Sequence, residues 1–276
     1  MTRHSLAIPV VVFAVALSVH SPSLAQNFLD NPRTQIGSSS VAPVHPPQTQ
    51  TSLSDEDMAR LLLVRRDYRE AQELFYKLTM QEPKNATYWN ELGISLHSQS
   101  LLAAALKCYQ KSAKLDSHYP DAVNNAGTIW YEEKKYARAI RAYHKAIGIK
   151  PDFAPFYVNL GYAYFNDKKY DDSILSFRKA LEIDPSAFDP SRSRSGTVIQ
   201  DRSVGTDRGR FYFMLAKSFA EAGNLERCIV YLKKSKDEGF ADFNSVKTDP
   251  SFAAVIKLPA LQELIEPKPV AEAVQP

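Results

Sequence analysis

Residues 136–152 read YARAIRAYHKAIGIKPD, and residues 170–186 read YDDSILSFRKALEIDPS. The two stretches begin 34 residues apart and place small, aromatic, aliphatic and proline residues in the same order. A period held over four units predicts a repeat architecture, because one unit cannot bury its apolar face alone and must stack on its neighbours. A small residue recurs at Ala71, Ala105, Ala139 and Ser173, and a ring follows four residues later at Phe75, Tyr109, Tyr143 and Phe177.

A second helical pattern precedes the first one in the later units, and it carries a glycine at Gly93, Gly127 and Gly161. We expect this glycine and the recurring small residue to let two antiparallel helices approach closely where they cross. Pro151 and Pro185 come directly after the second helix, where proline ends the hydrogen-bond ladder. The sequence therefore predicts two helices per unit.

These positions resemble the tetratricopeptide repeat family over about residues 52–240. Because several positions match in register across repeats, the resemblance is more specific than one matching unit would be. It implies an all-α fold, a right-handed α-solenoid of about five helix pairs with a short helical C-terminal cap. The matching residues are Trp89, Leu92, Gly93, Ala105 and Tyr109 in one unit, and Tyr157, Leu160, Gly161, Tyr164, Tyr170, Phe177, Ala180 and Pro185 in another.

The N-terminal region differs in composition from the repeats. A basic start, an apolar run over 6–19 and the small residues up to Ala25 are typical of a secretory signal peptide, with cleavage after residue 25. An uncleaved membrane anchor is the alternative, but the run is shorter than the ~20 residues that span a bilayer. We therefore expect an exported protein, periplasmic or secreted, with no stable membrane span after cleavage.

The remaining boundaries follow from composition and repeat period. An insertion is expected because Cys228 takes the slot of Ser173 after 55 residues, where the period is 34. The expected organisation is a signal peptide over 1–25, a flexible tether rich in Pro, Ser, Thr and Gln over 26–51, repeats at about 52–85, 86–119, 120–153, 154–185 and 209–239, an insert loop over 186–208, a cap over 240–266 and a disordered tail over 267–276.

The sequence contains no motif of a catalytic or cofactor-binding site. It has no phosphate-binding glycine loop and no nucleophile elbow, and its histidines and two cysteines lack the spacing of metal ligands. We therefore predict no enzyme, no cofactor and no metal. A net charge of +3 is too small to indicate nucleic acid. Cys108 and Cys228 lie three repeats apart, so we expect two separate thiols rather than a disulfide.

The resemblance places a ligand groove along the first helix of each repeat. Asn125 and Asn159 share one repeat position, and amides can pair with both the N–H and the C=O of an extended peptide. Rings in the groove would add rigid contact area, although packing between repeats is an alternative for both residue types. The groove residues that the family pattern gives are Asn90, Glu91, Ile94, His97, Asn124, Asn125, Thr128, Tyr131, Val158, Asn159, Tyr162, Phe165 and Lys217.

The predicted function is that of a scaffold or assembly factor that binds a partner protein or an extended peptide in this groove. The alternative is an accessory subunit of an envelope enzyme, or a binder of cell-wall glycan, that uses the arginine-rich stretch 186–210. A tolerated surface loop is a third interpretation of that stretch. Its candidate contact residues are Arg192, Arg194, Arg202, Arg208 and Arg210.

Overall fold

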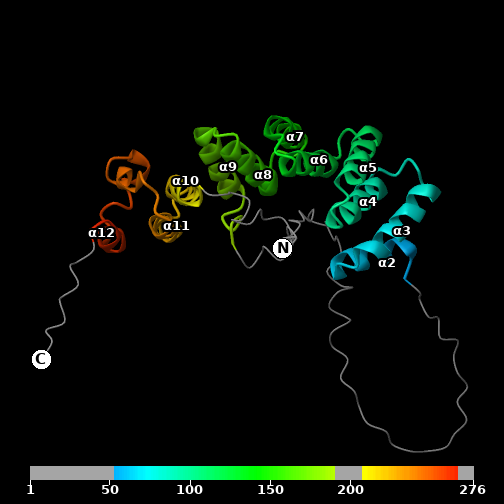
Figure 1. Ribbon diagram of the computed structural model, residues 1–276, viewed down its shortest axis with the longest axis horizontal. Helices are drawn as coiled ribbons and strands as arrows, with labels where there is room; N and C mark the ends of the chain where they lie inside the picture. The colour runs from blue at the N-terminus through cyan, green and yellow to red at the C-terminus, as the bar shows by residue number, and fades with distance from the viewer. Residues whose placement is uncertain (1–52, 190–206, 267–276) are drawn as a thin grey trace, which may run out of the picture.

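The computed structural model describes residues 53–189 and 207–266, and all regular structure in these ranges is helical (Figure 1). The predicted all-α fold of stacked helix pairs followed by C-terminal helices is confirmed. The helices are α2 (Asp55–Arg65), α3 (Tyr68–Gln81), α4 (Ala86–Ser98), α5 (Leu102–Leu115), α6 (Pro120–Glu132), α7 (Tyr136–Ile149), α8 (Ala154–Asn166), α9 (Tyr170–Ile183), α10 (Arg208–Glu221), α11 (Leu225–Asp237), η3 (Phe243–Lys247), η4 (Pro250–Phe252) and α12 (Pro259–Ile265).

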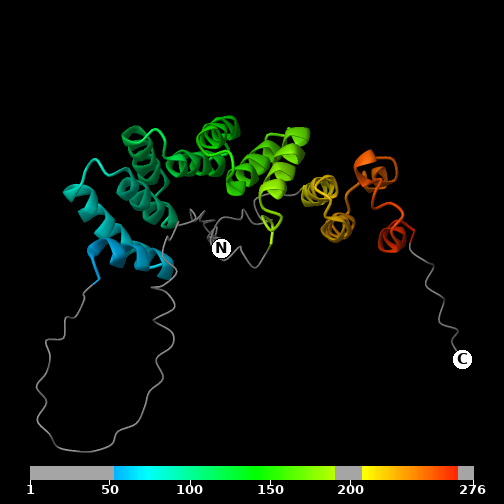
Figure 2. The same ribbon diagram turned by 180° about the vertical axis from the view of Figure 1, so that it is seen from behind.

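The helix pairs lie side by side in one row that follows an arc, which both views show (Figures 1 and 2). Helices α4, α6 and α8 lie toward the inner side of the arc and are called the inner helices below. Helices α5 and α7 lie on its outer side. Each inner helix is buried on almost every side, because it touches its own pair partner, the preceding pair and at least one neighbouring inner helix.

The recurring glycines of the inner helices each lie under a ring of the following helix. A Cβ atom added at Gly93 would lie 2.5 Å from the ring of Tyr109, and one at Gly127 would lie 2.7 Å from the ring of Tyr143. Both rings are fully buried. The sequence predicts a close approach of the two helices at the glycine and the small residue. In the structure, the nearest neighbour of the glycine is the ring of the following helix. The reason is that only a missing side chain leaves room for a flat aromatic face.

The turn between the two helices of each pair uses one left-handed residue. Arg66, Ser100, Lys134 and Lys168 have φ angles between 58° and 68° and follow one another at intervals of 34 residues. Gly223 has φ 78° at the equivalent turn between α10 and α11. A residue with a Cβ is disfavoured in this region by roughly 1 kcal/mol, so four of the five turns keep a small backbone strain.

The C-terminal elements pack on the last helix pair. Phe252 of η4 and Leu261 of α12 are fully buried, and Leu264 is half-buried against the same core. The ring of Phe252 meets Phe213 of α10 edge to face at 5.3 Å between centroids. These contacts cover apolar surface of α10 that has no further repeat to pack on.

Several expectations concern residues outside the described ranges. The signal peptide, the tether and the tail lie there, as does most of the insert with Arg192, Arg194 and Arg202. The expected insert boundary at 208 is displaced slightly, since α10 already begins at Arg208. Among the helices that the structure describes, none combines the length and the apolar character needed to cross a bilayer.

The two cysteines are buried and unbonded, as expected from their separation. Burial raises the pKa of the Cys108 thiol to about 11 and that of the Cys228 thiol to about 12. A thiol reacts as its thiolate, so both side chains are inert packing groups at neutral pH.

Candidate functional site

The side chains that the resemblance placed in an open groove lie between neighbouring inner helices. Asn90, His97, Asn125 and Tyr162 are at most 1% exposed. The expectation that these groups stand open to a ligand is therefore corrected, because adjacent inner helices approach closely enough to close over them. Lys217 is the half-buried member of the set. The buried members are Asn90, Glu91, Ile94, His97, Asn124, Asn125, Thr128, Tyr131, Val158, Asn159, Tyr162 and Phe165.

Four asparagine amides form one continuous chain of hydrogen bonds across the three inner helices. The amide of Asn159 donates to Asn124 at 2.9 Å, and that of Asn124 donates to Asn125 at 3.3 Å. Asn125 donates to Asn90 at 3.0 Å, and Asn90 donates to the hydroxyl of Tyr119 at 3.2 Å. Every amide donates in the same direction, so each bond polarises the next one. We call these four residues the asparagine chain.

The asparagine chain leaves an acceptor open at one end. Both polar atoms of the Asn125 side chain are used inside the chain, whereas Oδ1 of Asn159 has no hydrogen-bond partner. Oε2 of Glu91 is likewise buried without a partner. Glu91, Asn125 and Asn159 occupy the same position of three consecutive repeats, 34 residues apart. A buried donor, Nε of Arg60, has no partner in the described residues either. Buried acceptors are usually satisfied by protein groups, ordered water or a ligand, so these two oxygens are places where a donor can bind.

Burial shifts the titration of Glu91 strongly. Desolvation raises the pKa of this carboxyl to about 7 from an ordinary value of 4.5. The guanidinium of Arg60 on α2 opposes the shift, while the carboxylates of Asp121 and Glu56 add to it. Arg60 is itself paired with Glu56 at 2.7 Å. Glu91 is therefore present near neutral pH both as a neutral acid and as a carboxylate able to accept a donor.

Two more polar pairs join the inner helices with the same sequence offset as the asparagine chain. Nε2 of His97 lies 3.0 Å from a carboxylate oxygen of Glu132, and the amide of Asn166 donates to the hydroxyl of Tyr131 at 2.8 Å. Both pairs are 35 residues apart, as are Asn90 with Asn125 and Asn124 with Asn159. His97 also lies 3.4 Å from the hydroxyl of Tyr109, so both of its ring nitrogens have partners.

The remaining apolar candidates belong to the hydrophobic core. Tyr162 stacks on Phe211 with 5.2 Å between centroids, and Phe165 meets the same ring edge to face at 5.3 Å. Ile94 and Val158 lie in the two large clusters of buried apolar residues. Packing between repeats, the alternative interpretation of the rings, is what the structure shows for Tyr162 and Phe165.

The three basic candidates within the described ranges are engaged in ion pairs. Lys217 pairs with Asp249 near the cap at 2.9 Å. Burial acts to raise the pKa of Asp249, but the hydrogen bonds from Lys217 and Ser251 outweigh it and leave the pKa below its usual value. Arg208 lies 3.2 Å from Glu238 and Arg210 lies 2.9 Å from Asp207, both at the start of α10.

Half-exposed polar side chains flank the buried row at both ends of the inner helices. Thr87 and Asp121 occupy one position near the helix starts, and Ser98, Glu132 and Asn166 occupy another near the helix ends. We call these five residues the inner rim. They are half-exposed, whereas the asparagine chain is buried.

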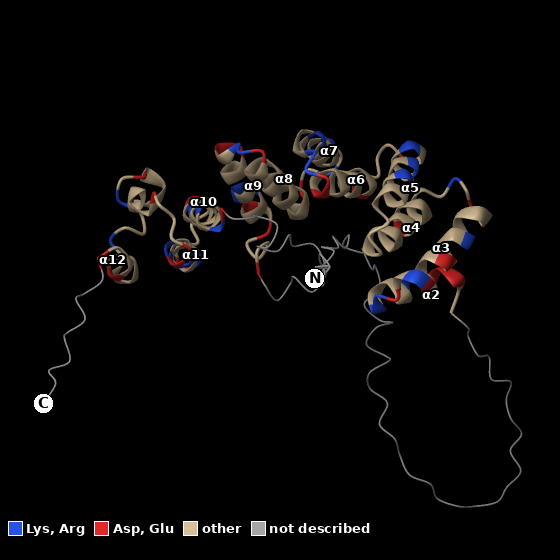
Figure 3. Ribbon diagram, in the orientation of Figure 1, with Lys and Arg blue, Asp and Glu red and all other residues tan. Residues whose placement is uncertain are grey.

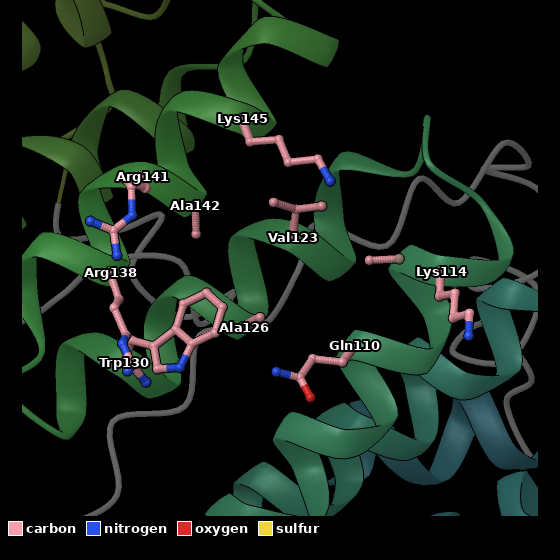
Figure 4. Close-up of a pocket in the computed structure, with 10 residues that line it drawn as sticks. Gln110, Lys114, Val123, Ala126, Trp130, Arg138, Arg141, Ala142 and Lys145 are labelled. Atoms are coloured by element: carbon pink, nitrogen blue, oxygen red, sulfur yellow. The ribbon is translucent and has the colours of Figure 1, made fainter.

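A pocket of about 580 Å³ opens between α5, α6 and α7 (Figure 4). Its floor is apolar, with Val123, Ala126 and Trp130 of α6. Sequence reasoning missed this pocket, because its basic edge combines residues of two different helices, α5 and α7. The signal was present, since α5 and α7 contain no acidic residue (Figure 3). The basic residues at its edge are Lys114, Arg138, Arg141 and Lys145.

The pairwise stacking of helices into an arc defines the chain as a helical-repeat protein of the α-solenoid class. The tetratricopeptide repeat model matches residues 154–187, a TPR repeat model matches 127–168, and a further tetratricopeptide repeat model matches 56–120. The chain is a tetratricopeptide repeat protein. No curated protein matches it in sequence.

Three of the solved structures to which this chain is similar share little sequence with it. MamA from Desulfovibrio magneticus RS-1 is 17% identical over 67% of this chain and 92% of its own, with a TM-score of 0.47. YrrB, described as a TPR protein with an unusual peptide-binding site, is 15% identical over 70% and 89%, with a TM-score of 0.45. The first TPR of Spaghetti (RPAP3), bound to an HSP90 peptide, is 22% identical over 41% and 90%, with a TM-score of 0.37.

Proposed function

We propose that this protein is a non-enzymatic scaffold or assembly factor whose inner face binds an extended segment of a partner protein. The observation that carries the proposal is the pair of buried acceptors without a hydrogen-bond partner, Oε2 of Glu91 and Oδ1 of Asn159. An extended peptide presents backbone N–H groups at regular intervals, which are the donors that these two atoms lack. The protein contributes a preformed arc, so little of it needs to be ordered on binding.

The position of the two acceptors fits a ligand that crosses three repeats. Glu91 belongs to α4 and Asn159 to α8, with α6 between them. The half-exposed rim residues Thr87, Asp121 and Asn166 lie on the same three helices. We expect a peptide lying across the inner helices to contact this rim first, and contact with the two buried acceptors requires the rim side chains to rotate. Because Asn159 is polarised by the whole asparagine chain, its oxygen is a stronger acceptor than an isolated amide.

The proposal includes export. The signal peptide expected over residues 1–25 favours a site of action in the periplasm or outside the cell, with the stretch 26–51 as a tether. The alternative, an accessory subunit of an envelope enzyme or a glycan binder that uses the insert, is less favoured, because Arg208 and Arg210 are already paired with carboxylates of the protein.

The experiment that tests the proposal is a cross-linked pull-down from an envelope fraction with the mature chain, residues 26–276. The bait variants are Glu91→Leu and Asn159→Leu, which remove the open acceptors, and Asn125→Leu, which breaks the asparagine chain without removing either open acceptor. A fourth bait lacks residues 191–206. All baits are compared at a temperature where circular dichroism shows that they are folded.

We expect a partner that is lost or at least tenfold depleted with Glu91→Leu and Asn159→Leu, and retained with Asn125→Leu and with the deletion. Loss of the partner only with the deletion would overturn the proposal and move the site to the insert. A partner that all four variants retain would exclude the inner face.

A further inference from the structure

We propose that the outer face of α5 and α7 is a second docking site, which takes an acidic segment of a partner protein with one apolar side chain at its centre. This site goes beyond the proposed function, since it lies on the opposite side of the arc from the asparagine chain. The proposal rests on charge, on shape and on the absence of internal partners for the groups involved.

The first observation is the segregation of charge. Helix α5 carries three lysines and α7 carries two arginines and a lysine, and neither helix has an acidic residue. Both helices are blue along their outer sides in Figure 3. The neighbouring outer helix α9 mixes the two signs, with Asp171, Asp172 and Glu182 beside Arg178 and Lys179. The positive potential is therefore local, although the whole chain has a net charge of only +3.

The second observation is that the basic groups around the pocket have no carboxylate to pair with. Elsewhere exposed cations do pair: Lys77 lies 2.7 Å from Asp55, and Lys135 lies 2.8 Å from Glu133. Within the described ranges, no ion pair involves any of the four cations that edge the pocket, which are Lys114, Arg138, Arg141 and Lys145.

The third observation is the shape and chemistry of the floor. The pocket of about 580 Å³ has room for a large side chain, and Trp130 and Val123 form much of its base (Figure 4). The indole N–H of Trp130 donates no hydrogen bond to any described residue, so it is available to a carboxylate or a carbonyl. Aromatic side chains in a partly desolvated pocket are common anchors of protein interfaces.

These features favour an acidic peptide over other polyanions. A nucleobase in the pocket needs hydrogen-bond partners along its edge, and methyl groups of Val123, Ala126 and Ala142 line most of the floor. A flat anionic membrane reaches the basic edge but leaves the floor empty. In a short peptide, an aromatic or branched aliphatic residue can fill the apolar floor of the pocket while the acidic residues on either side of it pair with the basic edge.

The test uses fluorescein-labelled nine-residue peptides in which Phe, Trp, Leu, Ile or Tyr stands between runs of Glu and Asp, titrated with the full chain by anisotropy. The first variant is Arg138→Glu/Arg141→Glu, with Lys179→Glu/Lys233→Glu as a control of equal charge change on other helices. The second variant, Ala113→Phe, fills the pocket from α5 and leaves the charges intact. Circular dichroism checks that each variant is folded.

We expect a dissociation constant below about 100 µM for at least one peptide at low salt, at least tenfold weaker binding after reversal at Arg138 and Arg141, and less than threefold change in the control. Ala113→Phe, or alanine at the peptide centre, should weaken binding at least fivefold. The proposal is overturned if no peptide binds, if the control loses as much affinity, or if the central residue makes no difference. Binding of phosphatidylglycerol vesicles or of a DNA duplex in place of every peptide would overturn it as well.

Discussion

The side-chain amide of Asn159 donates to the side-chain oxygen of Asn124 across two neighbouring inner helices, at 2.9 Å, and the two residues are 35 positions apart in the sequence. The amide of Asn125 makes the same contact with Asn90, one repeat earlier, at 3.0 Å. The sequence period is 34, so each bond joins one position of a repeat to the next position of the following repeat. Because of this offset, a polar residue of one repeat forms a hydrogen bond with a polar residue of the next repeat.

We expect the substitution of a residue in the asparagine chain to cost more stability when that residue has more hydrogen-bond partners in the chain. Asn124 is bonded to both Asn125 and Asn159, so Asn124→Ala leaves two buried polar groups unsatisfied. We expect a loss of about 2–4 kcal/mol in the free energy of unfolding, measured by urea denaturation. Gln110→Ala, at an exposed position of α5, is the control and should change it by less than about 0.5 kcal/mol. Equal small effects of the two substitutions would contradict the assignment.

The close packing of glycine under a ring predicts a severe effect of one added methyl group. Gly161 faces the fully buried ring of Phe177, which has no free space to move into. Gly161→Ala should lower the free energy of unfolding by about 2–4 kcal/mol. Gly148→Ala is a matched control in α7, where an added Cβ meets nothing within 4 Å. That substitution should raise stability by up to about 1 kcal/mol through helix propensity. Thermal unfolding should therefore show a lower melting temperature for Gly161→Ala and an equal or higher one for Gly148→Ala.

The left-handed turns predict stabilisation by glycine. Lys134 and Lys168 have φ angles of 58° and 62°, which glycine adopts without strain. Either residue replaced by glycine should gain a few tenths of a kcal/mol, up to about 1, after the larger chain entropy of the unfolded state is subtracted. Gly223→Ala, at φ 78°, is the reverse substitution and should lose about 1 kcal/mol. A lysine-to-glycine change that destabilises as much as Gly223→Ala would contradict the turn geometry.

The buried carboxyl of Glu91 predicts a pH-dependent effect of Glu91→Gln. The pKa is about 7 in the folded state against 4.5 in the unfolded chain, so the folded state holds the proton more tightly. This contribution to stability is complete below pH 4.5 and is lost as the pH rises through 7. Glutamine keeps the shape without titrating, so the variant should gain stability relative to the parent on going from pH 5 to pH 8, by about 2–3 kcal/mol.

Several charged and polar groups face Glu91 and affect its pKa, and one of them provides a control variant for this experiment. Arg60 and Glu56 come from α2, Asp121 comes from α6, and the hydroxyls of Tyr109 and Tyr119 lie within electrostatic range. Asp121→Asn should move the pKa of Glu91 down slightly and leave the direction of its pH dependence unchanged. A difference between Glu91→Gln and the parent that is the same at pH 5 and pH 8, measured by urea denaturation, would show that Glu91 does not titrate in this range.

The fold was predictable because the same residue types recur at the same positions in several repeats. The glycine of each inner helix and the ring of the next helix recur in register, so a single exception such as the missing glycine of α2 does not obscure the pattern. The insert was found by counting, since 55 residues separate two equivalent small residues in a chain with a 34-residue period.

The candidate site was predictable only in part, because a family position gives the direction of a residue but not its neighbours. Asn125 and Asn159 occupy one position, and the structure gives one of them two internal partners and leaves the other with an open oxygen. That difference depends on the preceding residue of the same helix, which is Asn124 before Asn125 and Val158 before Asn159. The basic pocket was missed for a related reason, since its edge combines α5 and α7, which are far apart in the sequence.

Site-specific photo-cross-linking tests the central claim most directly. A photo-reactive phenylalanine analogue placed at Ser98 or Asn166 lies on the inner rim, whereas the same group at Leu175 lies on an exposed position of α9. The account predicts that one partner segment is cross-linked from both rim positions, not from Leu175, and that Asn159→Leu abolishes both products. Cross-linking of the same partner from Leu175, with none from the rim, would contradict binding at the inner face.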